Sequence, residues 1–146
     1  MAITPVQKTA IEEVIKALLG APSRRTKRHL ADMFLDLVDR DSWPEYYEVH
    51  RAHPFSSFVL SHIDFCARKV IPQPRCIHGV QATLAQNKYK NALDAFEDLN
   101  LVFLNALHYN EDGSQIAKDA ATLRVSTFSH LPPSFCDSVL EGHPGE

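Results

Sequence analysis

The feature that most constrains this chain is a long helical repeat of apolar residues between Ala92 and Tyr109. Apolar side chains recur there every three or four residues and so fall on one face of a helix. They are Phe96, Leu99, Phe103 and Ala106, widened by Val102 and Leu107. Strand-like alternation is essentially absent from the chain. Because a helix with one apolar face must bury it against other elements, the sequence predicts an all-α bundle.

Other segments show the same helical spacing. Further helices are predicted at Thr4–Gly20, Leu30–Val38 and Ile77–Leu84. The first has a capping residue, Thr4, followed by a proline in the first turn. A long loop separates the second from the third, and a turn is expected at residues 87–91.

The C-terminal part predicts one more helix, a short one. Residues 110–113 close the long helix, and Ser114 can cap a last helix that carries Ile116, Ala120 and Leu123. We expect this helix to break soon after Arg124, and the Pro132-Pro133 pair forbids a long continuation. The domain should then span residues 1–128, with an irregular tail at 129–146.

Composition bounds the class of protein. With 146 residues and 45% hydrophobic content, the chain can bury one core but is too short for two ordinary domains. Its net charge of −3 does not indicate non-specific nucleic-acid binding. No stretch is apolar over the length of a membrane span, and the three cysteines show no CxxC spacing. We expect an intracellular protein with no membrane segment, structural disulfide or cofactor.

Two motifs carry a more specific signal. The first reads Trp43-Pro44-Glu45-Tyr46-Tyr47-Glu48-Val49, and the second, FLNALHYNEDGSQI, runs from Phe103 to Ile116. Together they resemble the ZA-loop and BC-loop signatures of bromodomains, and the pattern is most like that of polybromo and RSC-type chromatin-remodelling subunits. The resemblance implies a left-handed four-helix bundle with a long ZA loop and a short BC loop. An acetyl-lysine pocket would lie between these loops.

The resemblance also implies roles for individual residues. Asn110 would donate to the acetyl carbonyl, Tyr46 would hold the water network of the pocket, and Ile116 would be the gatekeeper. Asn105 would brace the loops. The remaining wall would come from Tyr109, Ala106 and Val38, the last at a position where relatives often carry proline.

The chemistry of the residues agrees with these roles. Acetylation turns a hydrated ammonium into a neutral amide with a methyl end, so a reader needs one fixed N–H donor in an apolar slot. Taken alone, Asn110 is better explained as a helix-ending residue in left-handed conformation, and Tyr46 and Ile116 as core. The joint spacing of the two motifs favours the binding interpretation.

Charged residues suggest two weaker hypotheses. Acidic residues in the two loops could attract a basic histone tail or could be ordinary solvated carboxylates; they are Asp39, Asp41, Glu45, Glu48, Glu111 and Asp112. The basic run from Arg24 to Arg28 could contact DNA, although solvation of a helix junction explains it better.

Catalysis and metal binding have little support. Histidines and cysteines crowd the long loop, but their spacings do not compose a tetrahedral zinc set, so no metal site is expected; they are His50, His53, His62, Cys66, Cys76 and His78. The chain shows no nucleophile motif, carboxylate pair or phosphate loop, and we expect no enzyme activity.

Residues 50–70 depart from the family pattern. Their deletion would join Val49 to Ile71 and restore the continuous pattern, so we interpret them as an insertion. The genetic code would also allow the inserted segment to be a retained intron.

The predicted function is recognition of acetylated histone tails within a nuclear chromatin-remodelling or transcription-regulatory complex, in contact with its other subunits. The alternative is a helical protein-interaction scaffold that has lost acetyl-lysine binding.

Overall fold

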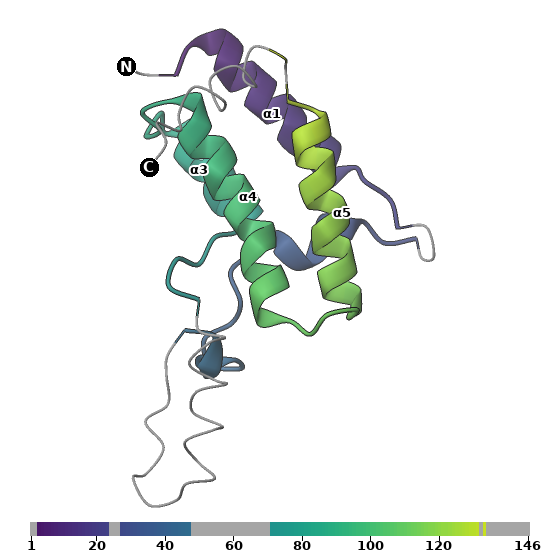
Figure 1. The fold of residues 1–146 in the computed structure, drawn as a ribbon. Helices are drawn as coiled ribbons and strands as arrows, with labels where there is room; N and C mark the ends of the chain where they lie inside the picture. The colour runs from purple at the N-terminus through teal and green to yellow at the C-terminus, as the bar shows by residue number, and fades with distance from the viewer. Residues whose placement is uncertain (1–2, 24–26, 48–70, 132, 134–146) are drawn as a thin grey trace, which may run out of the picture.

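The structure is a computed structural model that describes residues 3–23, 27–47, 71–131 and 133. In these ranges the chain forms α-helices, two 3-10 turns and no strand beyond an isolated bridge between Pro22 and His29. The helices are α1 (Pro5–Leu19), α3 (Ile77–Ala85), α4 (Ala92–Tyr109) and α5 (Gln115–Ser129), and the turns are η1 (Leu30–Phe34) and η2 (Pro44–Tyr46). Helices α4 and α5 lie side by side in opposite directions; α1 packs against both, and α3 packs against α4 and α1 (Figure 1).

Side-chain caps explain where the helices begin. Thr4 and Gln7 form a reciprocal capping box at the start of α1, with hydrogen bonds of 3.0 and 3.2 Å. Asn91 accepts from the Asp94 amide at 2.9 Å at the start of α4, and Ser114 caps α5 in the same way. The predicted starts of these helices are therefore confirmed, as are both ends of α4.

The apolar faces meet in one core. Large side chains from all four helices are almost completely buried in it, as the helical spacing predicts. The largest of them are Phe103, Ile11, Ile15, Leu18, Ile77, Leu99, Leu123 and Val80. Phe34 of η1 joins this core edge-to-face against Phe103, with ring centroids 5.6 Å apart.

The predicted helix at Leu30–Val38 is wrong, because only η1 forms there. One turn is enough to bury the apolar cluster of Leu30, Ala31 and Phe34. The carbonyl of Leu35, which a longer helix would use internally, instead accepts the amide of His78 at 3.0 Å. A short apolar segment gains little free energy by adding helical turns. The hydrogen bond from His78 to Leu35 is therefore favoured over a longer helix.

The predicted break after Arg124 is also wrong, because α5 continues to Ser129 and is capped by His130. Thr127 is buried on its inner face, and its hydroxyl donates to the Leu123 carbonyl at 2.9 Å, so the last turn has its own packing. The expected boundary between domain and tail at residue 128 stays a prediction.

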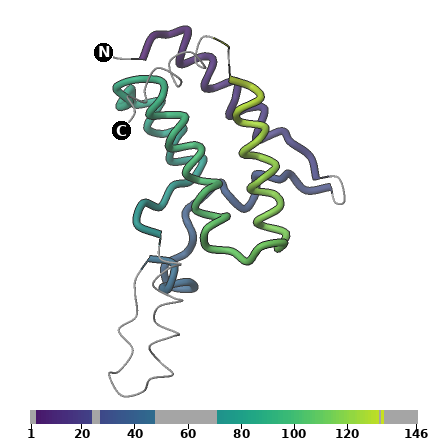
Figure 2. The backbone as a smooth tube through the Cα atoms, viewed as in Figure 1, coloured from purple at the N-terminus to yellow at the C-terminus, as the bar shows by residue number. Residues whose placement is uncertain are grey.

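The loops gather at one end of the bundle. The chain leaves η1, follows that end as residues 35–47, and returns as residues 71–76 to enter α3 (Figure 2). The short connection from α4 to α5 turns at the same end (Figures 1 and 2). Within the described ranges, no helix combines the length and apolarity needed to cross a membrane.

Candidate binding pocket

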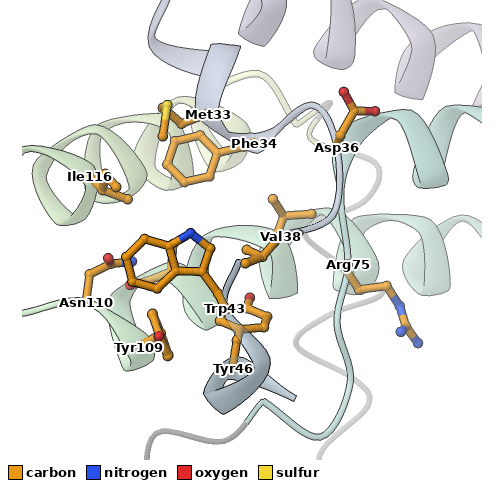
Figure 3. A pocket seen from close by; sticks show the side chains of 12 residues that line it. Met33, Phe34, Asp36, Val38, Trp43, Tyr46, Arg75, Tyr109, Asn110 and Ile116 are labelled. Carbon is orange, nitrogen blue, oxygen red and sulfur yellow. The ribbon is translucent and has the colours of Figure 1, made fainter. Parts of the chain in front are cut away.

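A cavity of about 230 Å³ opens at the loop end of the bundle. Its walls come from η1 and the segment after it, from η2, from the loop before α3 and from α4 and the start of α5 (Figure 3). The lining residues are Met33, Phe34, Asp36, Val38, Trp43, Tyr46, Arg75, Val102, Ala106, Tyr109, Asn110 and Ile116.

Helix periodicity explains which residues of α4 face the pocket. Val102, Ala106 and Tyr109 are four and three residues apart and therefore share one face of the helix. Asn110 follows at the helix end, and Ile116 approaches from the first turns of α5. The cavity is thus bounded on two sides by rigid helices, and on the others by loops.

Asn110 holds its amide in a fixed position. Its backbone is extended, with φ −86° and ψ 156°, so the left-handed helix-ending conformation considered for it is wrong. Its backbone N–H and its side-chain Nδ2 both donate to the Ala106 carbonyl, at 3.0 and 2.9 Å. An Asn side-chain nitrogen carries two N–H groups, so the second can serve a ligand.

Tyr46 brings a neutral hydroxyl to the pocket. Its ring is buried and stacks edge-to-face against Tyr47 and Tyr109, with centroid separations of 5.0 and 4.7 Å. Burial raises the pKa of Tyr46 to about 12, with smaller contributions from the two neighbouring tyrosines. The phenol is therefore protonated at physiological pH and can both donate and accept.

Several hydrogen bonds fix the loop walls. The Tyr47 hydroxyl donates to the Val38 carbonyl, and the Arg40 guanidinium lies 4.1 Å above the Tyr47 ring. On the other side of the pocket, the buried Asn105 donates from Nδ2 to the Gln73 carbonyl at 2.8 Å, linking α4 to the loop before α3. This geometry fits a bracing role for Asn105, which stays a prediction.

The charges around the pocket leave its interior without an anion. Asp36 is the one carboxylate among the lining residues, and it is 82% exposed and paired with His78 at 3.0 Å. Arg75 is bound to Asp98 at 3.0 Å, and Figure 3 shows its side chain pointing away from the cavity. An apolar slot with amide and phenol groups therefore suits a neutral polar ligand better than a cation.

The structure brings together every residue predicted for acetyl-lysine binding. Asn110, Tyr46, Tyr109, Ile116, Ala106 and Val38 all line this one cavity. Trp43, Met33 and Phe34 also line the cavity, although the two sequence motifs do not predict a role for them in the site. Met33 and Phe34 fall within the helix predicted at Leu30–Val38, whereas the short η1 turn leaves both at the pocket wall.

The acidic residues of the two loops form an acidic rim around the pocket, and one of them takes part in hydrogen bonds within its own loop. The Asp39 carboxylate accepts from the hydroxyl and the amide of Ser42 and from the amide of Asp41, and these hydrogen bonds lower its pKa. Asp41, Glu111 and Asp112 are exposed, Glu45 is partly buried, and Glu48 lies outside the described residues. Attraction of a basic tail to this rim stays a prediction.

The basic run from Arg24 to Arg28 is described only in part. Arg28 pairs with the buried Asp119 at 2.7 Å, whereas Arg24 and Arg25 lie outside the described residues.

Of the cysteines and histidines considered for a zinc site, Cys76 is free, and its thiol caps α3 by accepting from the Gly79 amide. Among the described residues no group of His, Cys, Asp or Glu could hold a metal ion; His50, His53, His62 and Cys66 are outside them.

Comparisons of the sequence agree with the predicted resemblance. The family model described as Bromodomain matches residues 18–122. The chain is 31% identical over 123 residues to chromatin structure-remodeling complex subunit RSC4 of Saccharomyces cerevisiae, covering 82% of this chain and 16% of that protein. Its identity to subunit rsc4 of Schizosaccharomyces pombe is 26% over 125 residues, covering 82% and 19%. The chain thus spans less than a fifth of the length of these relatives.

Solved structures agree on the fold. The Rsc4 tandem bromodomain superposes with a TM-score of 0.70 at 21% identity, over 96% of this chain and 47% of that one. The bromodomain of human BAZ1A gives a TM-score of 0.60 at 20% identity, over 84% and 88%. These likenesses confirm the predicted all-α fold, a left-handed four-helix bundle.

Proposed function

The chain belongs to the bromodomain family, and we propose that it binds acetylated lysine in histone tails as part of a chromatin-remodelling complex. Its curated relatives are named as subunits of such complexes. A protein with this role acts in the nucleus, by recruitment and without catalysing a reaction. The pocket supplies the chemistry for the proposed recognition.

The observation that carries the proposal is the Asn110 amide, which the Ala106 carbonyl holds at the edge of a predominantly apolar cavity. The free N–H of Nδ2 would donate to the acetyl carbonyl. The methyl end would lie against apolar walls such as Val102 and Ala106, and the Tyr46 hydroxyl would bind water or the amide. Each donor is fixed before the ligand arrives, which lowers the entropic cost of binding.

Selection for the acetyl group follows from desolvation. An unmodified lysine would lose the hydration of its ammonium in a cavity whose one lining carboxylate, Asp36, is exposed and already paired. A buried charge without a close partner costs several kcal/mol. The amide of acetyl-lysine has no such cost and gains the Asn110 hydrogen bond.

A pulldown with immobilised histone-tail peptides tests the proposal. The full chain is offered pairs of peptides that are identical except for acetylation of one lysine. We expect capture on acetylated peptides and little on their unmodified partners. Equal capture on both forms would contradict acetyl-lysine recognition and support a reader of basic charge, whereas capture on neither, by a folded chain, would support the interaction scaffold.

A further inference from the structure

The loop segment 71–76, which leads into α3, is tied to one side of α4. Arg75 donates from Nε to the Asp98 carboxylate at 3.0 Å, and the Gln73 carbonyl accepts from the Asn105 side-chain amide at 2.8 Å. Asp98 and Asn105 are seven residues apart, or about two helical turns, so their side chains project from the same side of α4. The segment is therefore held along this helix at two points that lie two residues apart.

The same side of α4 leads to the wall of the pocket. Tyr109, about one turn beyond Asn105, packs its ring against Tyr46, and both tyrosines line the pocket. The Tyr46 carbonyl accepts from the amide of Ile71, the first residue of the segment, at 2.9 Å. Through this short segment, Asp98 is connected to a pocket that it does not line itself.

Open space beside the segment makes these connections important. A second cavity, of about 300 Å³, lies between the segment, α3 and α4. Pro74, Arg75 and Cys76 line it from the segment, and Gly79 and Val80 line it from α3. Arg75 lines the pocket as well, so the segment has a cavity on either side. Because side chains do not fill this space, packing alone does not fix the segment, and its hydrogen bonds to α4 have to hold it.

The contacts of Asp98 and Arg75 suit them to this task. The second carboxylate oxygen of Asp98 accepts from the hydroxyl of the buried Tyr89 at 2.8 Å, which fixes the carboxylate on α4. The Arg75 guanidinium also donates from Nη1 to the Pro74 carbonyl at 2.9 Å. The side chains of Arg75 and Asp98 are 37% and 26% exposed, so solvent screens their attraction only in part. The guanidinium therefore joins the backbone of the loop to a fixed anion.

We propose that Asp98 is a positioning residue for acetyl-lysine recognition, which acts through Arg75 to hold segment 71–76, and with it Tyr46, in the binding geometry. The inference rests on the proposed function and adds a determinant of affinity outside the pocket. A loop that is already in place binds its ligand without an ordering cost. A loop released from Asp98 can shift into the second cavity and has to be ordered when the ligand binds.

Calorimetric titration of the full chain with an acetylated histone-tail peptide tests this inference. Arg75→Met keeps the length of the side chain and removes its charge, and Asp98→Ala removes the acceptor. We expect each to bind the peptide about fivefold more weakly than the parent. The double variant should bind no more weakly than Arg75→Met, because Asp98 acts through Arg75. Arg75→Lys, which can still pair with the carboxylate, should recover most of the affinity.

A matched control separates positioning from general stability. Arg28 and Asp119 form a similar pair, at 2.7 Å, and neither residue lines the pocket. Arg28→Met should lower the unfolding temperature but keep the parental affinity. Hydrogen exchange of the free chain adds a local readout, since the Ile71 amide should exchange faster in Arg75→Met than in Arg28→Met. Circular dichroism establishes that each variant is folded.

The contradicting outcomes fall on different claims. Parental affinity in a folded Arg75→Met variant, an equal loss of affinity in Arg28→Met, or unchanged exchange of the Ile71 amide would overturn the positioning role and leave the proposed function intact. A folded parent that binds no acetylated histone peptide by calorimetry would contradict the proposed function, and the role of Asp98 in recognition would fall with it.

Discussion

The backbone amide of Ile71 donates a 2.9 Å hydrogen bond to the carbonyl of Tyr46, although a long stretch of sequence separates the two residues. If residues 50–70 were removed, Ile71 would follow Val49 directly and would be the fourth residue after Tyr46. The same hydrogen bond would then have the spacing of a helical turn. Tyr46 and Ile71 are thus placed as a continuous chain would place them, which supports the insertion hypothesis.

We therefore predict that deletion of residues 50–70 preserves or raises stability and leaves the pocket able to bind. The segment itself lies outside the described residues. A long surface insertion changes closure entropy little, by about 0.6 kcal/mol for each doubling of loop length. The measurement is thermal unfolding and acetyl-peptide titration of the deletion variant beside the full chain. An unfolded deletion variant would show that the segment is a packed part of the domain.

Asn110→Ala should weaken binding of an acetylated peptide by about 1–3 kcal/mol, because the acetyl carbonyl would be buried without its donor. The fold should survive, since Ala106 keeps the backbone hydrogen bond from residue 110. Asn110→Asp is the sharper variant, because it keeps the shape and replaces the donor with an acceptor, and it should bind at least as weakly. Parental affinity in both folded variants, measured by calorimetry, would remove Asn110 from the role of anchor.

Arg28→Ala should destabilise the domain without changing ligand affinity. The variant leaves the Asp119 carboxylate buried with Gln115 as its remaining side-chain hydrogen-bond donor, at 2.8 Å. Because Arg28 is about one-third exposed, we expect a loss of about 2 kcal/mol in chemical denaturation. Lys118→Ala, an exposed cation on the same helix as Asp119, is the control. An equal, small effect of both substitutions would show that the ion pair contributes little.

Alkaline pH should lower stability partly through Tyr46. Its folded pKa of about 12 lies above the ordinary value near 10, so the folded state binds the phenolic proton more tightly than the unfolded state. This contribution is complete below the unfolded pKa and is lost as pH rises through about 12. Chemical denaturation across this range should show a shallower decline in Tyr46→Phe than in the parent. Tyr89, whose pKa burial also raises, would maintain part of the decline. Identical slopes would contradict the assignment.

The sequence predicted the long helices well because their apolar faces are regular and their caps are local. Both ends of α4 follow from the apolar repeat and from Asn91. The helix predicted at Leu30–Val38 is wrong because periodicity identifies an apolar face but does not reveal how far a helix continues. The carbonyl of Leu35 is bound by His78, far away in the sequence, and no local pattern reports such a contact.

The site could be predicted in part for a similar reason. Asn110 and Tyr46 were found through two motifs whose joint spacing is specific, and the structure lines one cavity with both. Trp43 belongs to the first motif, but whether its ring turns to the core, to solvent or to a pocket depends on the turn at Asp39. That geometry arises from tertiary packing, and sequence spacing alone does not determine it.

Calorimetric titration of the full chain with one histone-tail peptide, in acetylated and unmodified form, measures the preference for the acetyl group itself. We expect the acetylated form to bind at least about tenfold more tightly, a difference of about 1.4 kcal/mol. This preference should persist at raised salt, because desolvation rather than long-range attraction produces it. Equal affinity for both forms, lost at raised salt, would contradict acetyl-lysine recognition and would identify the acidic rim as the binding surface.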